Sequence, residues 1–145
     1  MENRINLSEV DPKAYEAMIG LEKYLAQSGL DKTLYELIKT RASQINGCAF
    51  CINMHTRDAM AIGETAQRLF LLDAWRETNL YSEKERAVLA LTEAMTSLTN
   101  GQVPDAIYKN AAAHLTQNEM AAVIMAVVAI NGWNRIAITT RMPLD

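Results

Sequence analysis

Apolar residues recur at helical spacing along nearly the whole chain. No stretch alternates apolar and polar positions over the length of a strand with β-branched enrichment. Start and stop signals divide this pattern into segments. The expected helices run over about residues 11–28, 31–46, 48–62, 64–77, 82–98, 104–114 and 116–130. The pattern therefore predicts an all-α fold of about six to seven helices, in a single domain of residues 1–145.

Several of these boundaries carry capping signals. Ser82 with Glu85, and Thr116 with Glu119, match the capping box, in which two residues three positions apart satisfy each other's backbone N–H groups. Gly47 is expected to end the helix before it, as glycine commonly does at the C-terminal end of a helix.

A short repeat accompanies this pattern. The tripeptide Ile-Asn-Gly occurs at residues 45–47 and again at 130–132, and each copy leads into a further predicted helix. A structural duplication is one interpretation and chance is the other, because three residues are a short match.

The longest apolar run covers residues 120–130, eleven residues, and is well short of the roughly 20 that span a bilayer. Because this run is apolar on all sides, its helix is expected to be central or to lie against another subunit. The N-terminal segment has no apolar core of signal-peptide length. We therefore expect a soluble, intracellular protein located in the cytoplasm, with no membrane partner.

The composition agrees with a packed domain. Half of the residues are apolar, which supports a core that buries roughly two-thirds of the surface of the unfolded chain. The chain has 14 Lys and Arg against 17 Asp and Glu, a formal charge of −3. The basic residues are scattered rather than clustered, which argues against nucleic acid and anionic membranes as partners.

The chain has two cysteines, Cys48 and Cys51, three positions apart. Secreted domains of this size tend to use more cysteines and to spread them along the chain. A bridge between such near neighbours closes almost no loop, so structural stabilisation is a poor reason for the pair. Redox chemistry, a metal site or chance remain.

A histidine shares the helical face of the two cysteines. At about 100° per residue, Cys48, Cys51 and His55 lie on one side of a helix, with Cys51 and His55 as direct neighbours. Cys48 stands in the first turn, where the helix dipole favours a thiolate. Dithiol chemistry needs an accessible thiolate, a second thiol and a base, and His55 suits the role of base. If the two helices pack antiparallel, Glu36 on the preceding helix can orient His55 or a water.

Other interpretations remain open at this point. The cysteines can be buried packing residues, or they can form half of a Cys₂His₂ zinc site if His114 folds back onto them. A thioredoxin-like site is excluded, because no βαβ pattern lies beside the cysteines. His114 is otherwise most simply a C-terminal helix cap, Glu93 faces either the site or solvent, and the tryptophans Trp75 and Trp133 are expected to anchor a core or an interface.

The spacing Glu36-x11-Cys48-x2-Cys51-x3-His55 resembles the signature of the carboxymuconolactone decarboxylase superfamily, specifically its alkylhydroperoxidase D-like (AhpD-like) branch. The likeness covers most of residues 31–140 and includes the segments NGCAFCINMHTRDAMAIGETAQRL, LYSEKERAVLALTEAMT and NGWNRIAI. It implies an all-α homo-oligomer, commonly a trimer or hexamer. It also implies thiol-dependent reduction of a small peroxide without metal, haem or flavin, and a dithiol reductant as partner.

The resemblance also implies roles for the site residues. Cys51 would attack the peroxide, Cys48 would resolve the sulfenic acid to a disulfide, and Glu36 and His55 would form the proton relay. The helix dipole, by contrast, favours Cys48 as the thiolate. In alkylhydroperoxidase D itself a histidine precedes the second cysteine, where this chain has Phe50; the change implies a weaker relay or a more apolar substrate. A thiol–disulfide oxidoreductase or redox sensor for a protein partner, and a non-catalytic helical oligomer, are the alternative functions.

Overall fold

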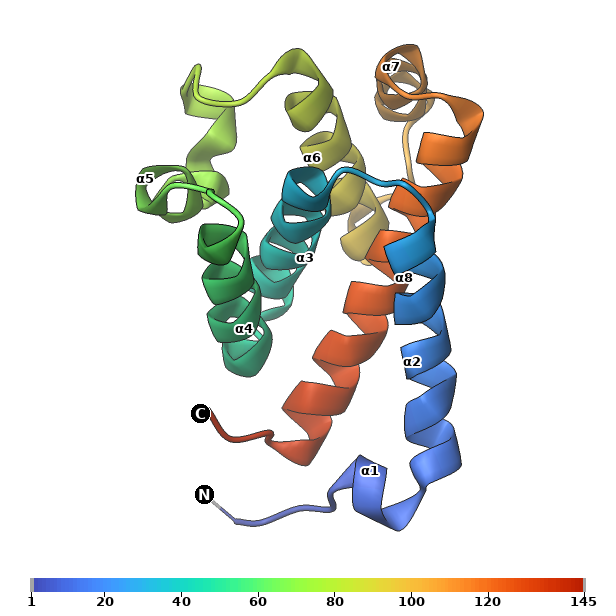
Figure 1. Cartoon of the computed structure of the whole chain (residues 1–145). Coiled ribbons are helices and arrows are strands. Elements are labelled where there is room, and N and C mark those ends of the chain that lie inside the picture. The colour runs from blue at the N-terminus through green and yellow to red at the C-terminus, as the bar shows by residue number, and fades with distance from the viewer. Residues whose placement is uncertain (1, 145) are drawn as a thin grey trace.

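Residues 2–144, which the computed structural model describes, form helices joined by short turns and contain no strand (Figure 1). The all-α prediction is confirmed. In chain order the helices are α1 (Leu7–Val10), α2 (Pro12–Gln27), α3 (Lys32–Asn46), α4 (Ala49–Ala61), α5 (Ala66–Phe70), the 3-10 helix η1 (Leu72–Glu77), α6 (Glu83–Thr96), the 3-10 helix η2 (Leu98–Asn100), α7 (Asp105–His114) and α8 (Gln117–Thr140).

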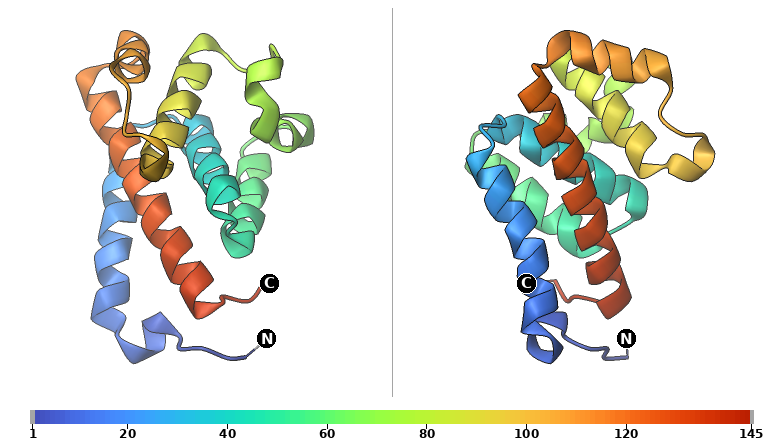
Figure 2. Two further views of the ribbon diagram at one scale, coloured as in Figure 1. Left: turned by 180° about the vertical axis from the view of Figure 1, so that it is seen from behind. Right: turned by 90° about the vertical axis from the view of Figure 1, so that its right-hand side faces the viewer.

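Helix α8 is the central helix of the domain and packs against α2, α3 and α6. The two views of Figure 2 show α8 running obliquely past α2, with which it is in contact. The predicted apolar run supplies the buried face of α8, with Val123, Ala126 and Ile130 fully enclosed. By length and composition alone α8 is able to cross a membrane, but 44% of its most apolar window is buried inside the protein. We therefore interpret α8 as the core helix of a soluble fold.

The two copies of the Ile-Asn-Gly tripeptide lie in different structural settings, which favours chance over duplication, and the expectation that the second copy leads into a further helix is wrong. Gly47 ends α3 in a left-handed conformation (φ 69°), as predicted, whereas Gly132 lies inside the uninterrupted helix α8. A single glycine inside a helix costs only about 1 kcal/mol, so α8 continues through Gly132. A Cβ atom at this position would come within 2.9 Å of the flexible end of the Met18 side chain on α2, which would have to shift.

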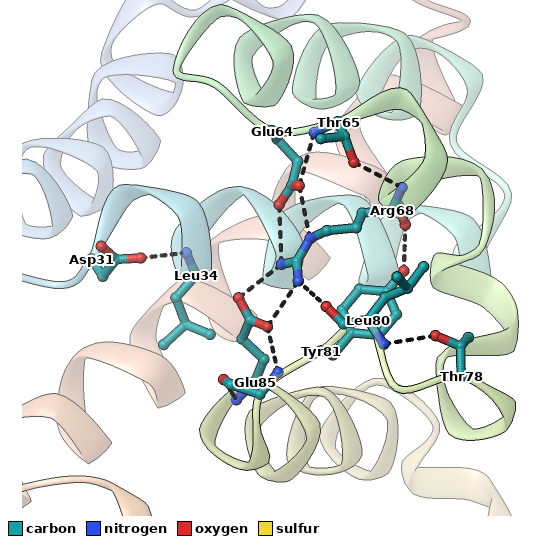
Figure 3. Close-up of polar contacts among 10 residues, drawn as sticks. Asp31, Leu34, Glu64, Thr65, Arg68, Thr78, Leu80, Tyr81 and Glu85 are labelled. Carbon is teal, nitrogen blue, oxygen red and sulfur yellow. Dashed lines mark hydrogen bonds and ion pairs between the residues drawn. The ribbon is translucent and has the colours of Figure 1, made fainter.

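The single helix predicted over residues 64–77 is also wrong. The chain forms α5, turns at Leu71 and continues as η1, in which Ala74 leaves helical geometry. Arg68 links this segment to its neighbours, because its guanidinium group donates to Glu64, to Glu85 and to the backbone oxygen of Leu80 (Figure 3). These bonds tie α5 to the start of α6, and a continuous helix would not place Arg68 among all three partners.

The short helix α1 was not predicted, and neither was the continuation of α8 to Thr140. Both predicted capping boxes are present, at Ser82 with Glu85 and at Thr116 with Glu119. Local capping chemistry thus fixes the starts of α6 and α8, and α8 ends where Arg141 adopts a left-handed conformation (φ 52°).

Candidate functional site

The cysteine pair lies at the turn between α3 and α4, which pack against each other (Figure 1). Gly47 reverses the chain, and Cys48 is the N-cap residue of α4. The Cys48 sulfur accepts a hydrogen bond from the backbone N–H of Cys51, at 3.3 Å. An N-cap side chain normally accepts such a bond from an unpaired N–H of the first helical turn, so the sulfur occupies the place of a capping oxygen. The predicted position of Cys48 at the start of a helix is confirmed.

A disulfide joins Cys48 and Cys51. Only 1% of Cys48 and 2% of Cys51 is exposed. The structure therefore contains the oxidised form of the dithiol, enclosed by protein on nearly all sides. The interpretation of the two cysteines as separate packing residues is wrong, because the sulfurs are bonded to each other.

Glu36 and His55 form a buried pair beside the disulfide. Their helices bring Oε2 of Glu36 within 2.9 Å of Nδ1 of His55. The expectation that the packing of α3 on α4 carries Glu36 to His55 is confirmed. Because Nδ1 is occupied by the carboxylate, Nε2 remains as the nitrogen that can exchange a proton with another group.

Cys51, His55 and Glu36 line one cavity of about 270 Å³. Its wall is largely apolar, and Phe50 is part of that wall. The remaining lining residues come from α2, α3, α4, α8 and the C-terminal segment: Tyr15, Ile19, Glu22, Tyr35, Lys39, Met54, Asp58, Trp133, Ala137 and Met142. The cavity has room for a small organic molecule next to the sulfur of Cys51.

A second buried polar group lies in the wall of this cavity. Lys39, only 1% exposed, forms an ion pair with Glu22. The same carboxylate accepts hydrogen bonds from the Tyr35 hydroxyl and from Nε1 of Trp133, the latter at 2.9 Å. Sequence reasoning missed Glu22, Tyr35 and Lys39 as site residues and assigned Trp133 to a core or interface. One signal in the sequence could have indicated this group: Lys39 follows Glu36 by three residues and lies on the otherwise buried side of its helix.

These contacts change the acidity of the paired groups. Burial tends to raise the pKa of Glu22, but the charge of Lys39 and the hydrogen bonds from Lys39, Tyr35 and Trp133 outweigh it, so the pKa is lowered. Burial lowers the pKa of Lys39, and the carboxylates of Glu22 and Glu36 oppose this change. The pKa of Tyr35 is raised by burial and by its bond to Glu22. The Glu22 carboxylate is therefore held in its ionised form.

The other candidates lie elsewhere. His114 donates from Nδ1 to the carbonyl oxygen of Asn110, at 2.8 Å, in the last turn of α7, as expected for a helix cap. Glu93 faces neither the cavity nor open solvent, because it accepts bonds from Nε1 of Trp75, from Arg41 and from Arg76.

Across residues 2–144, the group of ligand-type atoms close enough to hold a metal consists of Glu36, His55 and Asp58, within 4.8 Å of one another. It contains neither cysteine and not His114, so the structure does not bring together the four ligands that a Cys₂His₂ zinc site would need. Within this group, Glu36 and His55 are paired with each other.

Comparison with known proteins assigns the family. The sequence profile of the carboxymuconolactone decarboxylase family matches residues 12–94, more than half of the chain. The uncharacterised protein YdfG of Bacillus subtilis is 43% identical over 138 residues, which cover 95% of this chain and 94% of YdfG. The chain belongs to the carboxymuconolactone decarboxylase family.

Solved structures agree with this family assignment. A protein of unknown function from Agrobacterium tumefaciens, proposed to be the antioxidant defence protein AhpD, is 39% identical, with a TM-score of 0.96 over 99% of both chains. This match supports the AhpD-like branch of the family, as the spacing of the site residues predicted. The debrominase Bmp8 is 17% identical, with a TM-score of 0.84 over 94% of this chain and 74% of its own, and shares the fold.

Proposed function

We propose that this protein is a cytoplasmic, homo-oligomeric peroxidase that reduces small hydroperoxides with its Cys48–Cys51 dithiol and without a bound cofactor. The observation that carries the proposal is the common cavity wall of Cys51, His55 and Glu36, with Cys51 bonded to Cys48. A nucleophilic sulfur, a base and a group that orients the base are the parts that activated thiol chemistry needs.

The reaction starts from the reduced dithiol. Nε2 of His55 takes the proton of the Cys51 thiol, and the thiolate attacks the terminal oxygen of the hydroperoxide. The O–O bond breaks, Cys51 is oxidised by two electrons to the sulfenic acid, and the leaving alkoxide takes a proton from the His55 imidazolium to become an alcohol. Cys48 gives up its thiol proton and attacks the sulfur of Cys51; the S–O bond breaks, and the sulfenic oxygen leaves as water after taking up that proton. An external dithiol reduces the resulting disulfide by two successive exchanges.

The surroundings of the two sulfurs support this division of roles. Cys51 lines the cavity and stands one helical turn before His55. Cys48 is not among the lining residues, and its sulfur faces the N–H of Cys51 at the start of α4. A helix N-terminus stabilises a thiolate, which is the form that a resolving cysteine needs. The dipole argument for Cys48 and the family role of Cys51 are thus compatible.

The cavity also favours small reactants. Its apolar wall, with Phe50 beside Cys51, suits the organic part of a short alkyl or aryl hydroperoxide. A protein thiol would have to reach sulfurs that are at most 2% exposed, so burial argues against the alternative of a thiol–disulfide oxidoreductase for a protein partner.

The test is stopped-flow oxidation of the fully reduced protein by cumene hydroperoxide, with thiols counted before and after. We expect loss of two thiols per chain and a Cys48–Cys51 disulfide in the mass spectrum. Cys48→Ser should react once and stop at the sulfenic acid, while Cys51→Ser should not react. Survival of both thiols in excess peroxide, or an unchanged rate in Cys51→Ser, would overturn the proposal.

A further inference from the structure

The cavity wall contains more negative than positive side chains. Three carboxylic residues line it: Glu22 from α2, Glu36 from α3 and Asp58 from α4. Lys39 is the sole lysine or arginine among the lining residues within the described part of the chain. A thiolate on Cys51 would add a further negative charge to this enclosed space, where charges are poorly screened.

Lys39 is placed where its charge acts on this site. It lies one helical turn after Glu36 on α3, and its ammonium group interacts electrostatically with both Glu22 and Glu36. The ammonium also lies 4.3 Å from the centre of the Tyr35 ring, a cation–π contact. Glu22 is held in turn by Tyr35 and Trp133. Residues from three helices thus fix one positive charge in the wall next to the proton relay.

Stability alone does not account for this arrangement. Removing two charges from water is costly, and well-packed apolar residues of similar size often stabilise a core as well as a buried ion pair does. All four members of the group, Glu22, Tyr35, Lys39 and Trp133, also line the cavity that Cys51 lines. The ion pair is therefore part of the site and not of a distant core.

We propose that Lys39 is a positioning residue of the peroxidase site, whose ammonium group offsets the surrounding carboxylates so that Cys51 can become a thiolate at neutral pH. Glu22, Tyr35 and Trp133 hold the ammonium in place. The role given to Lys39 rests on the proposed function, but the titration that tests it needs no peroxidase activity. The titratable groups that surround Cys51 and Lys39 in the cavity are Tyr15 and Glu22 of α2, Tyr35 and Glu36 of α3, and His55 and Asp58 of α4.

The test measures the Cys51 thiolate directly and uses no peroxide. In the full chain carrying Cys48→Ser, Cys51 is the one remaining thiol, and the ultraviolet absorbance of its thiolate is followed against pH. The variants added to this background are Lys39→Met, Lys39→Arg, and Lys23→Met as the matched control, since Lys23 is an exposed lysine on α2.

We expect Lys39→Met to raise the midpoint of thiolate formation by about one pH unit, the usual effect of losing a nearby opposite charge. Lys39→Arg should return the midpoint toward that of the parent, and Lys23→Met should leave it unchanged. The proposal is overturned if Lys39→Met and Lys23→Met have the same midpoint. A merely structural role would change the unfolding transition without moving this midpoint.

Loss of one member of a buried pair can prevent folding, so a second variant is needed. Glu22→Gln with Lys39→Met removes both charges and leaves no unpaired ion. We expect an upward shift of the Cys51 midpoint here as well, smaller than that of the single variant. An unchanged midpoint in this folded double variant would also overturn the proposal.

In the two-cysteine protein, Lys39→Met should slow peroxide reduction about tenfold at neutral pH, and the rate should recover at high pH. If no form of the protein reduces peroxide, the thiolate titration still decides the role of Lys39.

Discussion

Nδ1 of His55 and Oε2 of Glu36 lie 2.9 Å apart, although the residues are 19 positions apart and belong to different helices. Both side chains are buried, so water competes poorly for this contact. A carboxylate beside Nδ1 favours the tautomer with the proton on that nitrogen, which leaves Nε2 as the base. It also stabilises the imidazolium that forms when Nε2 accepts a proton. The pair therefore has the arrangement of an oriented base.

Replacing the carboxylate of this pair should slow the chemistry and spare the fold. Glu36→Gln keeps the shape of the side chain and loses the charge that supports the imidazolium. We expect the second-order rate of peroxide reduction to fall about 100-fold at neutral pH. Stopped-flow kinetics with the reduced protein measures it, and Glu16→Gln, an exposed glutamate on α2, is the control. A wild-type rate in Glu36→Gln would contradict the relay.

Two glycines should respond to alanine in opposite directions. Gly47 has a φ of 69° at the end of α3, where a side chain is strained, so Gly47→Ala should lower the free energy of unfolding by about 1 kcal/mol. Gly20 lies inside α2 with open space around it, so Gly20→Ala should raise the free energy of unfolding by about 1 kcal/mol. Urea unfolding of both variants checks this, and a shift of the same sign in both would contradict the backbone argument.

The contact between α3 and α8 contains a buried amide network. Nδ2 of Asn134, a fully buried residue, donates to Oγ of Ser43, and Oδ1 of Asn134 accepts from Asn46, each at 2.9 Å. Asn134→Ala removes both of these bonds from a buried position and should lower the free energy of unfolding by about 2 kcal/mol. Asn118→Ala, at an exposed position of α8, should change it by less than about 0.5 kcal/mol. Equal effects of the two substitutions in urea unfolding would refute the role of the network.

Glu93 should contribute a pH-dependent part of the stability. Burial tends to raise the pKa of this carboxyl, but hydrogen bonds from Trp75, Arg76 and Arg41 and the charge of Arg41 outweigh burial, and the pKa lies below its ordinary value of 4.5. A carboxyl whose pKa is lowered by folding stabilises the protein above its ordinary pKa, and this contribution is lost as the pH falls through the lowered value.

Glu93→Gln should therefore lower the free energy of unfolding at pH 7 by about 1 kcal/mol. The difference from the wild type should shrink as the pH falls below 4.5, where the wild-type carboxylate becomes protonated. Urea unfolding at several pH values tests this, with Glu77→Gln, an exposed glutamate, as the reference. A difference that stays constant down to low pH would exclude the ionised carboxylate as its source.

Sequence patterns predicted what depends on near neighbours in the chain. The capping residues Ser82 and Thr116 identify the starts of two helices, because a cap bonds to a backbone group three positions away. The face shared by Cys51 and His55 follows from helical spacing. The approach of Glu36 to His55 could be predicted because a single turn at Gly47 separates their two helices.

The remaining features depend on packing between distant segments. Gly132 does not end α8, whereas Gly47 ends α3 in the same tripeptide, so the local sequence alone does not decide between the two outcomes. Glu22, Lys39 and Trp133 meet in one wall although they belong to three helices, and no spacing relates them. A buried lysine resembles a solvated one in the sequence until its partners are known. The charged part of the site therefore could not be predicted, whereas its sulfur and imidazole could.

The burial of both sulfurs has a consequence for the order of events. Cys51 lines the cavity, Cys48 is not among its lining residues, and both are buried. Under the proposed function, the hydroperoxide and the reductant would both reach the pair through this cavity, one after the other. The kinetics would then be ping-pong. A large excess of either reactant would slow turnover, because it would occupy the cavity that the other reactant needs.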